Sequence, residues 1–108
     1  MPGMFKVSQS DQQYIFEYLN GQGEVQLISP PFANKKETET AIQAVRVGSL
    51  MSQQIGKSST SEGEHIFMIS DSSGMPVARS VPFSDEMAFN NALHHVRSDA
   101  CTAEISYA

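Results

Sequence analysis

The sequence contains 108 residues, 40% hydrophobic and 18% charged, which is the composition of one ordinary globular domain. Twelve acidic residues outweigh seven Lys and Arg, and the net charge of -5 argues against nucleic acid, whose phosphates require clustered cations. No apolar run approaches the ~20 residues that span a bilayer, and the first residues lack the pattern of a signal peptide. The single cysteine, Cys101, cannot form an internal disulfide. We therefore expect a cytoplasmic protein without membrane contact.

The first half of the chain predicts three strands joined by turns. The expected strands cover residues 5–7, 14–19 and 24–28. In the second of them Tyr14, Phe16 and Tyr18 alternate with other residues, which places three aromatic rings on one face of a sheet. The segment Asn20-Gly21-Gln22-Gly23 has turn chemistry because glycine tolerates positive φ, and it lacks the Lys-Ser/Thr of a phosphate-binding loop. We therefore expect the second and third strands to form a hairpin.

A helix is expected after the Pro31-Phe32 step. Asn34, with Glu37 three residues later, is typical of an N-cap with a capping box, and Gly48 is expected to end the helix. The apolar stripe of this helix has the spacing of one buried face and comprises Thr38, Ala41, Ile42, Val45 and Ser49. We therefore expect one side of the helix to pack against the sheet.

The second half predicts the same order of elements. A strand shared between the halves is expected at 52–57, then a polar loop at 58–64, strands at 65–69 and 76–79, and a final strand at 103–107. Because Pro76 has no N–H to donate, its strand is expected to start there or to lie at a sheet edge, with the stretch 77–80 as the exposed edge. Ser84, followed by Asp85 and Glu86, is expected to cap a second helix. The buried stripe of that helix comprises Phe89, Ala92, Leu93, Val96 and Ala100.

The two halves are related by a repeat with an offset of 51 residues. Residues 4–57 align with 55–108 without a gap and share twelve identical positions, where chance would give about three or four. The identical pairs include Lys6/Lys57, Ser8/Ser59, Phe16/Phe67, Ser29/Ser80, Phe32/Phe83, Val45/Val96 and Arg46/Arg97. We therefore predict the α+β class: two tandem β-β-β-α repeats, about 4–51 and 52–108, with pseudo-twofold symmetry, an antiparallel sheet packed against two helices, and a C-terminal strand.

This pairing of repeats predicts the domain, the oligomeric state and the core. We expect one domain over residues 1–108, and a monomer, because two matching units on one chain cover each other without a second chain. The side chains expected to be buried are Phe16, Ile42, Val45, Phe67, Leu93 and Val96.

A short pattern recurs in both halves: Phe, then Gly, then Ser, then Phe, followed by a capped helix with two spaced aliphatic residues. It runs through Phe16, Gly23, Glu24, Ser29, Phe32, Ile42 and Val45, and again through Phe67, Gly74, Ser80, Phe83, Leu93 and Val96. The pattern resembles that of the YegP-like family of small bacterial proteins, and the resemblance covers nearly the whole chain. It implies an α+β tandem repeat with pseudo-twofold symmetry, and it implies no established activity.

Six residues are candidates for contact with a ligand: Ser29, Phe32, Arg46, Ser80, Phe83 and Arg97. The Ser and Phe pairs precede helix N-termini, where exposed backbone N–H groups attract anions. The alternative is that each Ser bonds to backbone and each Phe fills the core. The two arginines lie in the last turns of the helices, where they complement the helix dipole or contact an anion or a partner.

The residues with catalytic or metal-binding chemistry form no recognisable set. His94 and His95 are adjacent and point about 100° apart on a helix, whereas helical metal ligands are spaced three or four residues apart. His65 is on a strand, and Cys101 lies near the C-terminal end of a helix, where the field disfavours a thiolate. We therefore expect no catalytic residues, no metal site and no cofactor.

Three functions remain open on the sequence alone. The first is a non-enzymatic module that binds an unknown protein partner or a small molecule. The second is a small enzyme that uses His94 or His95 as an acid or base. The third is a structural or stress-associated protein without a discrete site.

Overall fold

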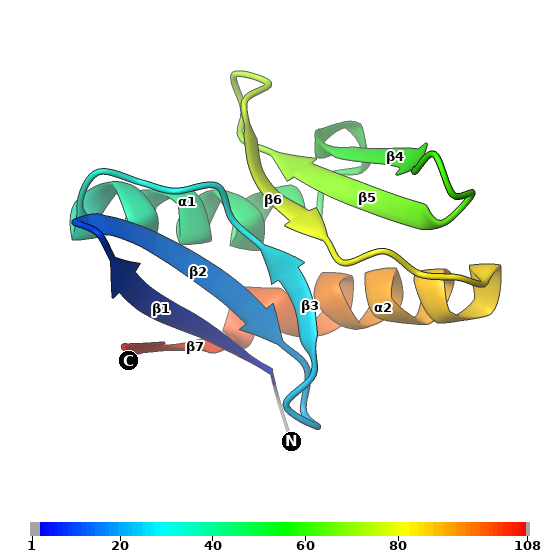
Figure 1. Ribbon diagram of the computed structural model, residues 1–108, viewed down its shortest axis with the longest axis horizontal. Coiled ribbons are helices and arrows are strands. Elements are labelled where there is room, and N and C mark those ends of the chain that lie inside the picture. Colours follow the sequence, from blue (N-terminus) through cyan, green and yellow to red (C-terminus); the bar gives the residue numbers. More distant parts are fainter. Residues whose placement is uncertain (1–2, 108) are drawn as a thin grey trace.

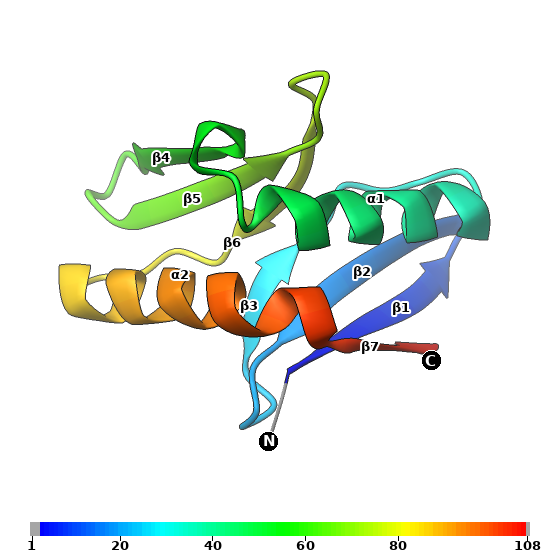
Figure 2. The same cartoon turned by 180° about the vertical axis from the view of Figure 1, so that it is seen from behind.

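Seven strands form one sheet, and two helices cover one of its faces (Figures 1 and 2). The computed structural model describes residues 3–107. In chain order the elements are β1 (Met4–Ser10), β2 (Gln13–Leu19), β3 (Val25–Ile28), α1 (Lys35–Gly48), the short 3-10 helix η1 (Ser52–Gln54), β4 (Ile55–Ser59), β5 (His65–Ser70), β6 (Pro76–Ser80), α2 (Glu86–Asp99), the 3-10 helix η2 (Ala100–Thr102) and β7 (Glu104–Tyr107). Neither helix in the described part of the chain has the length and apolar character needed to cross a membrane.

The core lies between the two helices and the sheet, as the repeat pattern predicts. All six predicted core residues are buried: Phe16, Ile42, Val45, Phe67, Leu93 and Val96. The aromatic alternation in β2 is confirmed, because Phe16 and Tyr18 are fully buried against Phe5, with ring centroids 5.9 and 5.1 Å from the Phe5 ring. Edge-to-face and tilted contacts of this kind add to the stabilisation that burial provides.

The helix starts follow the predicted capping chemistry with one correction. In α1, Glu37 donates its backbone N–H to Asn34 Oδ1 at 2.8 Å, and Asn34 Nδ2 donates to the Glu37 carboxylate at 3.0 Å. In α2 the N-cap is Asp85, which accepts from the Ala88 N–H at 2.7 Å, so the prediction of Ser84 as the cap is wrong by one residue. Aspartate and serine cap helices about equally well, so composition alone does not decide between neighbours.

Gly48 is the last residue of α1, and it lies close to β5. A Cβ atom at Gly48 would lie 2.8 Å from Ile69 Cγ2 and 3.0 Å from the Ser70 carbonyl oxygen. No side chain fits that gap without displacing the strand. The prediction that Gly48 ends the helix is confirmed, and the close approach to β5 explains why a glycine stands at this position.

The sheet is mixed, which corrects the prediction of an antiparallel sheet. Its strand order is β4-β5-β6-β3-β2-β1-β7, and six of the strands pair antiparallel. β7 pairs parallel with β1, with Met4 opposite Glu104 and Val7 opposite Tyr107. A parallel pair requires a long crossover connection, and here the connection is nearly the whole chain.

Two further predictions about strands are corrected. Residues 52–54 form η1, so the expected strand at 52–57 begins only at Ile55. β6 does begin at Pro76, but it lies inside the sheet between β5 and β3, so the expected edge at 77–80 is wrong. The edges are β4 and β7, because β6 of one half pairs with β3 of the other.

The gapless alignment of the two halves fails in their first strands. It places Ser58 opposite Phe67, by analogy with Val7 opposite Phe16, but the structure pairs Lys57 with Phe67. The β1–β2 connection is a tight turn in which Asp11 and Gln12 have positive φ, whereas a five-residue loop, 60–64, joins β4 to β5. That loop shifts β4 by one residue, so the identities Lys6/Lys57 and Ser8/Ser59 do not mark equivalent positions.

Candidate functional site

The hydroxyl groups of the two predicted serines, Ser29 and Ser80, are hydrogen-bonded to backbone groups inside the sheet. Ser29 Oγ accepts from the Phe16 N–H and donates to the Pro30 carbonyl, both at 2.8 Å. Ser80 Oγ accepts from the Phe67 N–H at 3.0 Å and donates to the carbonyl of the following residue at 3.0 Å. Both residues are buried, so their hydroxyl groups position the strands and the segments that follow.

The two predicted phenylalanines are half-buried, and their rings have different surroundings. Phe32 stacks on Phe16 at 6.2 Å between centroids, while Phe83 meets Phe89 edge-on at 6.3 Å. Phe32 also lines a hollow of about 350 Å³ between α1 and β6, which we call the α1 hollow. Its other lining residues are Lys36, Glu37, Thr40, Ala41, Ala44, Asp71 and Val77.

Asp71 supplies a negative charge at the rim of the α1 hollow. Its Oδ1 accepts from the Ser73 hydroxyl at 2.7 Å and from the backbone N–H groups of Ser73 and Met75 at 2.9 and 3.0 Å. The Ser73 hydroxyl, followed by the Met75 N–H, lowers the pKa of Asp71 below its ordinary value. The carboxylate is therefore ionised at neutral pH, and it accepts the hydrogen bonds that hold the turn between β5 and β6.

Arg46 is bound inside the molecule. Its Nη2 donates to the Ala103 carbonyl at 2.5 Å, and its guanidinium carbon lies 5.7 Å from the centroid of the Phe5 ring. Ala103 is buried and directly precedes β7. Arg46 therefore holds the segment that leads into β7 by a hydrogen bond, and its guanidinium lies over the ring of Phe5 in β1 as a cation–π contact.

We expect Arg46→Ala to lower the free energy of unfolding by ~1–3 kcal/mol, because the Ala103 carbonyl would lose its donor. Denaturant melts measure this loss, and amide exchange should show that β7 opens more readily. Arg97→Ala is the matched control and should change stability by less than ~0.5 kcal/mol, since Arg97 is exposed. Equal losses in the two variants would contradict the assignment.

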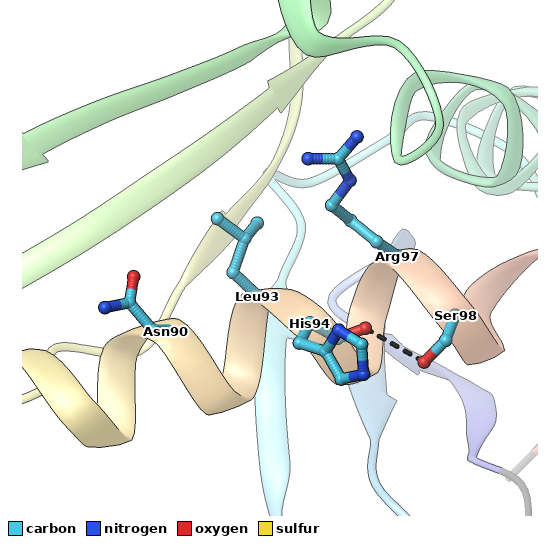
Figure 3. Close-up of a pocket in the computed structure, with 5 residues that line it drawn as sticks. All are labelled: Asn90, Leu93, His94, Arg97 and Ser98. Carbon is cyan, nitrogen blue, oxygen red and sulfur yellow. Dashed lines mark hydrogen bonds between the residues drawn. The ribbon is translucent and has the colours of Figure 1, made fainter.

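Arg97 lies on the exposed side of α2, at a second hollow (Figure 3). This α2 hollow has a volume of about 360 Å³ and is lined by Asn90, Leu93, His94, Arg97 and Ser98. Figure 3 shows Asn90, Leu93 and Arg97 extending from the same side of the helix, while the Ser98 hydroxyl donates to the His94 carbonyl at 2.9 Å. Arg97 makes no hydrogen bond or ion pair with any of residues 3–107.

The histidines and the cysteine stand apart from this arrangement. His94 and His95 are exposed and their rings meet edge-on at 6.0 Å, while His65 leans on Phe89 at 5.6 Å. His95 Nδ1 lies 4.0 Å from the Asp99 carboxylate, and both groups are exposed. Cys101 is exposed as well. Within residues 3–107 no three His, Cys, Asp or Glu side chains are grouped as metal ligands.

The sequence reasoning missed one feature, the open edge of β4. The backbone of His65 exchanges hydrogen bonds with Phe83, and the Phe67 N–H is bound by Ser80, so both residues face β6. Backbone direction alternates along a strand, so the intervening residues Ile66 and Met68 face β4, where they meet Ser58 and Gly56.

The remaining backbone groups of β4 point out of the sheet. These are the N–H and C=O of Lys57 and Ser59 and the C=O of Ile55, whose N–H is bound by Ser52. We call this set the β4 edge. The sequence predicted an edge strand at β6 because Pro76 has no N–H to donate. No residue pattern predicted that β6 pairs with β3.

Comparison with known proteins identifies the fold. No protein-family model and no curated protein matches the sequence. The structure is similar to that of a UPF0339 protein from Shewanella oneidensis, with a TM-score of 0.93 and 23% sequence identity over 99% of this chain and 92% of that chain. It is also similar to yegP from E. coli, a protein of unknown function, with a TM-score of 0.91 and 23% identity over 99% of this chain and 93% of that chain. The α+β fold implied by the YegP-like resemblance is confirmed, and neither of these similar structures indicates an activity.

Proposed function

We propose that this chain is a non-enzymatic binding module, one domain built from two β-β-β-α units, which takes up an extended segment of a partner protein at the β4 edge. The observation that carries the proposal is that β1 and β4, the first strands of the two halves, differ in what lies along their outer sides. β1 has a further strand, β7, along its outer side, whereas no strand within residues 3–107 lies along the outer side of β4. Unpaired N–H and C=O groups on a sheet edge are a template for strand addition.

Several local details support the duplication with its pseudo-twofold axis. Asn20 Oδ1 accepts from the N–H groups two and four residues later, and Asp71 Oδ1 does the same. The strand register shifts after Tyr18 and again after Ile69. Each of these positions recurs after 51 residues, as do the two serine bridges described above. Under this symmetry β4 corresponds to β1, and the place beside β4 corresponds to the place that β7 fills.

β4 is also the better template of the two sheet edges. β7 has four residues, begins with the exposed acid Glu104, and is tied to α1 through Tyr107, whose hydroxyl donates to Glu39 and whose ring lies 4.2 Å from Lys35 Nζ. β4 has five residues and no acidic side chain. Short and charged edges resist strand addition, so the β4 edge is the one open to a partner.

A second copy of the chain fits this edge poorly. An antiparallel pair of β4 strands centred on the outward-facing Lys57 would place two lysines opposite each other, and like charges in that position are destabilising. We therefore propose a monomer. Sedimentation should give a mass near the 11.8 kDa of one chain.

The test uses the full chain and a set of short capped peptides in which valine alternates with threonine, glutamate or lysine. We expect at least one peptide to shift the amide signals of Lys57 and Ser59 in NMR spectra and to slow their exchange. Ser59→Pro should weaken that binding by about tenfold or more, because proline removes an outward N–H without breaking the β4–β5 ladder.

Ser61→Pro is the matched control. Ser61 follows Thr60 in a turn closed by the Gly63 N–H on the Thr60 carbonyl, a position that favours proline. This variant should bind the peptide as the unaltered chain does. Peptides that leave the β4 signals unchanged, or that shift only the signals of the α1 hollow, would overturn the proposal.

A further inference from the structure

The α1 hollow lies between the two halves of the chain and has an apolar wall. Its lining comes from the segment before α1, from α1 itself, from the turn between β5 and β6, and from β6. Ala41 and Val77 are buried in the core, and Phe32 and Ala44 are half-buried against it. A volume of about 350 Å³ is at the small end of the range for ligand pockets. The hollow is therefore suited to the apolar body of a small molecule.

The charged residues that line the hollow are unbalanced. They are Lys36, Glu37 and Asp71, which is one cation and two carboxylates. The hydrogen bonds to Asp71 all reach Oδ1, and the Asn34 amide reaches Glu37 Oε2. Asp71 Oδ2 and Glu37 Oε1 are therefore left without a donor among residues 3–107. Lys36 forms an ion pair with neither carboxylate within the described part of the chain. The unused oxygens suit a charge-assisted hydrogen bond from a bound cation.

The turn that contains Asp71 does not require its charge, as the other half of the chain demonstrates. Asn20 stands 51 residues earlier, and its Oδ1 accepts from the N–H groups of Gln22 and Glu24 at 2.9 and 3.0 Å. Asp71 Oδ1 accepts from the N–H groups two and four residues later at the same distances. An uncharged asparagine therefore suffices for this kind of turn, and the charge of Asp71 is available to a ligand.

The counterpart of the α1 hollow on α2 has different chemistry. At the offset of 51, Val77 corresponds to Gln26, and Ala44 corresponds to His95. The hollow at this second place has a volume of about 240 Å³ and is lined by Asn20, Gly21, Gln22, His95 and Asp99. An apolar wall beside carboxylates is thus found in the α1 hollow and not in its counterpart. The repeat itself does not impose this combination.

We propose that the α1 hollow binds a small organic cation in which an ammonium group is attached to an apolar body such as an aromatic ring. The apolar body packs against Phe32, Ala41 and Val77. The ammonium group donates to Asp71 Oδ2, and the charge of Glu37 adds to the attraction. The site shares no residue with the β4 edge, so this inference goes beyond the proposed function, and each can fail without the other.

The test is an NMR titration of the full chain with phenethylamine, which is an ammonium ion at neutral pH. Two matched probes keep the ring and replace the ammonium group, by a hydroxyl group in phenethyl alcohol and by a carboxylate in hydrocinnamate. We expect phenethylamine to shift the amide signals of Thr40, Ala44 and Asp71 in a saturable manner. Both other probes should bind at least about tenfold more weakly.

Four substitutions test the charges. Asp71→Asn should weaken phenethylamine binding by about tenfold and leave the turn intact, as Asn20 indicates. Glu37→Gln should weaken it by about threefold, since glutamine also completes a capping box. Lys36→Met removes the opposing cation, and the matched position of α2 is already a methionine, so this variant should bind about threefold more tightly. Glu62→Gln is the control of equal charge change, and it should alter nothing because Glu62 lies outside the hollow.

Four results would overturn the inference. The first is equal binding of the three probes, and the second is an Asp71→Asn variant that binds phenethylamine as the unaltered chain does. The third is weaker binding by Lys36→Met, because Lys36 would then hold an anionic part of the ligand. The fourth is the absence of saturable shifts at the α1 hollow. None of these results bears on the β4 edge, which the peptides and Ser59→Pro test separately.

Discussion

Phe67→Ala is expected to lower the free energy of unfolding by ~3–5 kcal/mol, which approaches the whole stability of a small domain. Phe67 is fully buried, its ring meets Phe89 edge-on at 5.8 Å, and its backbone N–H is held by the buried Ser80 hydroxyl. Truncation removes the ring from the centre of the core, and the surrounding strand cannot collapse into the space because that hydrogen bond fixes its backbone.

Chemical denaturation monitored by circular dichroism measures the loss for Phe67→Ala. Phe83→Ala is the matched control, because Phe83 contacts the same Phe89 ring but is half-buried, and its loss should be clearly smaller. A loss below ~1 kcal/mol for Phe67→Ala would contradict its central place in the core.

The core is also the part of the fold that the sequence predicts best. Phe16 and Phe67 stand in strands with clear alternation, and Val45 and Val96 stand in helices with clear helical spacing. Burial of an apolar face is a local property, so it leaves a periodic trace along the chain. The capping of α1 by Asn34 was predicted for the same reason, since cap and helix are neighbours in sequence.

Alkaline pH is expected to destabilise the protein through Tyr18. Burial raises the pKa of Tyr18 to about 12 from its ordinary value of 10.0, with smaller contributions from the charges of Asp99 and Cys101. The side chain is fully buried, and its hydroxyl has no hydrogen-bond partner among residues 3–107. Ionisation would therefore place an uncompensated charge in the core.

The sign of the pH effect follows from the raised pKa. The stability that depends on neutral Tyr18 is fully present below about pH 10 and is lost as the pH rises toward about 12. A shift of this size corresponds to ~2–3 kcal/mol. Urea melts at a series of pH values from neutral to strongly alkaline measure the loss.

Tyr18→Phe should remove most of this alkaline loss, and it should not reduce stability at neutral pH, because the deleted hydroxyl bonds to no group in the described part of the chain. Tyr107→Phe is the control. Tyr107 is exposed, and although the Glu39 hydrogen bond raises its pKa, this variant should keep the alkaline loss. An identical pH profile for Tyr18→Phe and the unaltered chain would show that Tyr18 is not the cause.

The candidate site was less predictable than the core because long-range pairing determines it. Arg46 and Arg97 were both identified from the repeat, but their unequal roles depend on where Ala103 and β7 lie. The identity of the open edge depends on β6 pairing with β3 rather than ending the sheet. The one-residue shift of β4 depends on the length of a loop, and a gapless alignment has no means of detecting it. None of these facts leaves a periodic trace in the sequence.

The pairing of β7 with β1 has a consequence for the order in which the chain folds during translation. Met4 lies opposite Glu104, so the contact joins segments 100 residues apart. A ribosome adds about 5–20 residues per second, so the outer side of β1 stays uncovered for several seconds after β1 itself has been made. During that time the nascent protein presents an open strand at each end of its sheet. Synthesis of residues 104–107 covers β1, and from then on the sheet ends in the short strand β7, which begins with an acid, on one side and in β4 on the other.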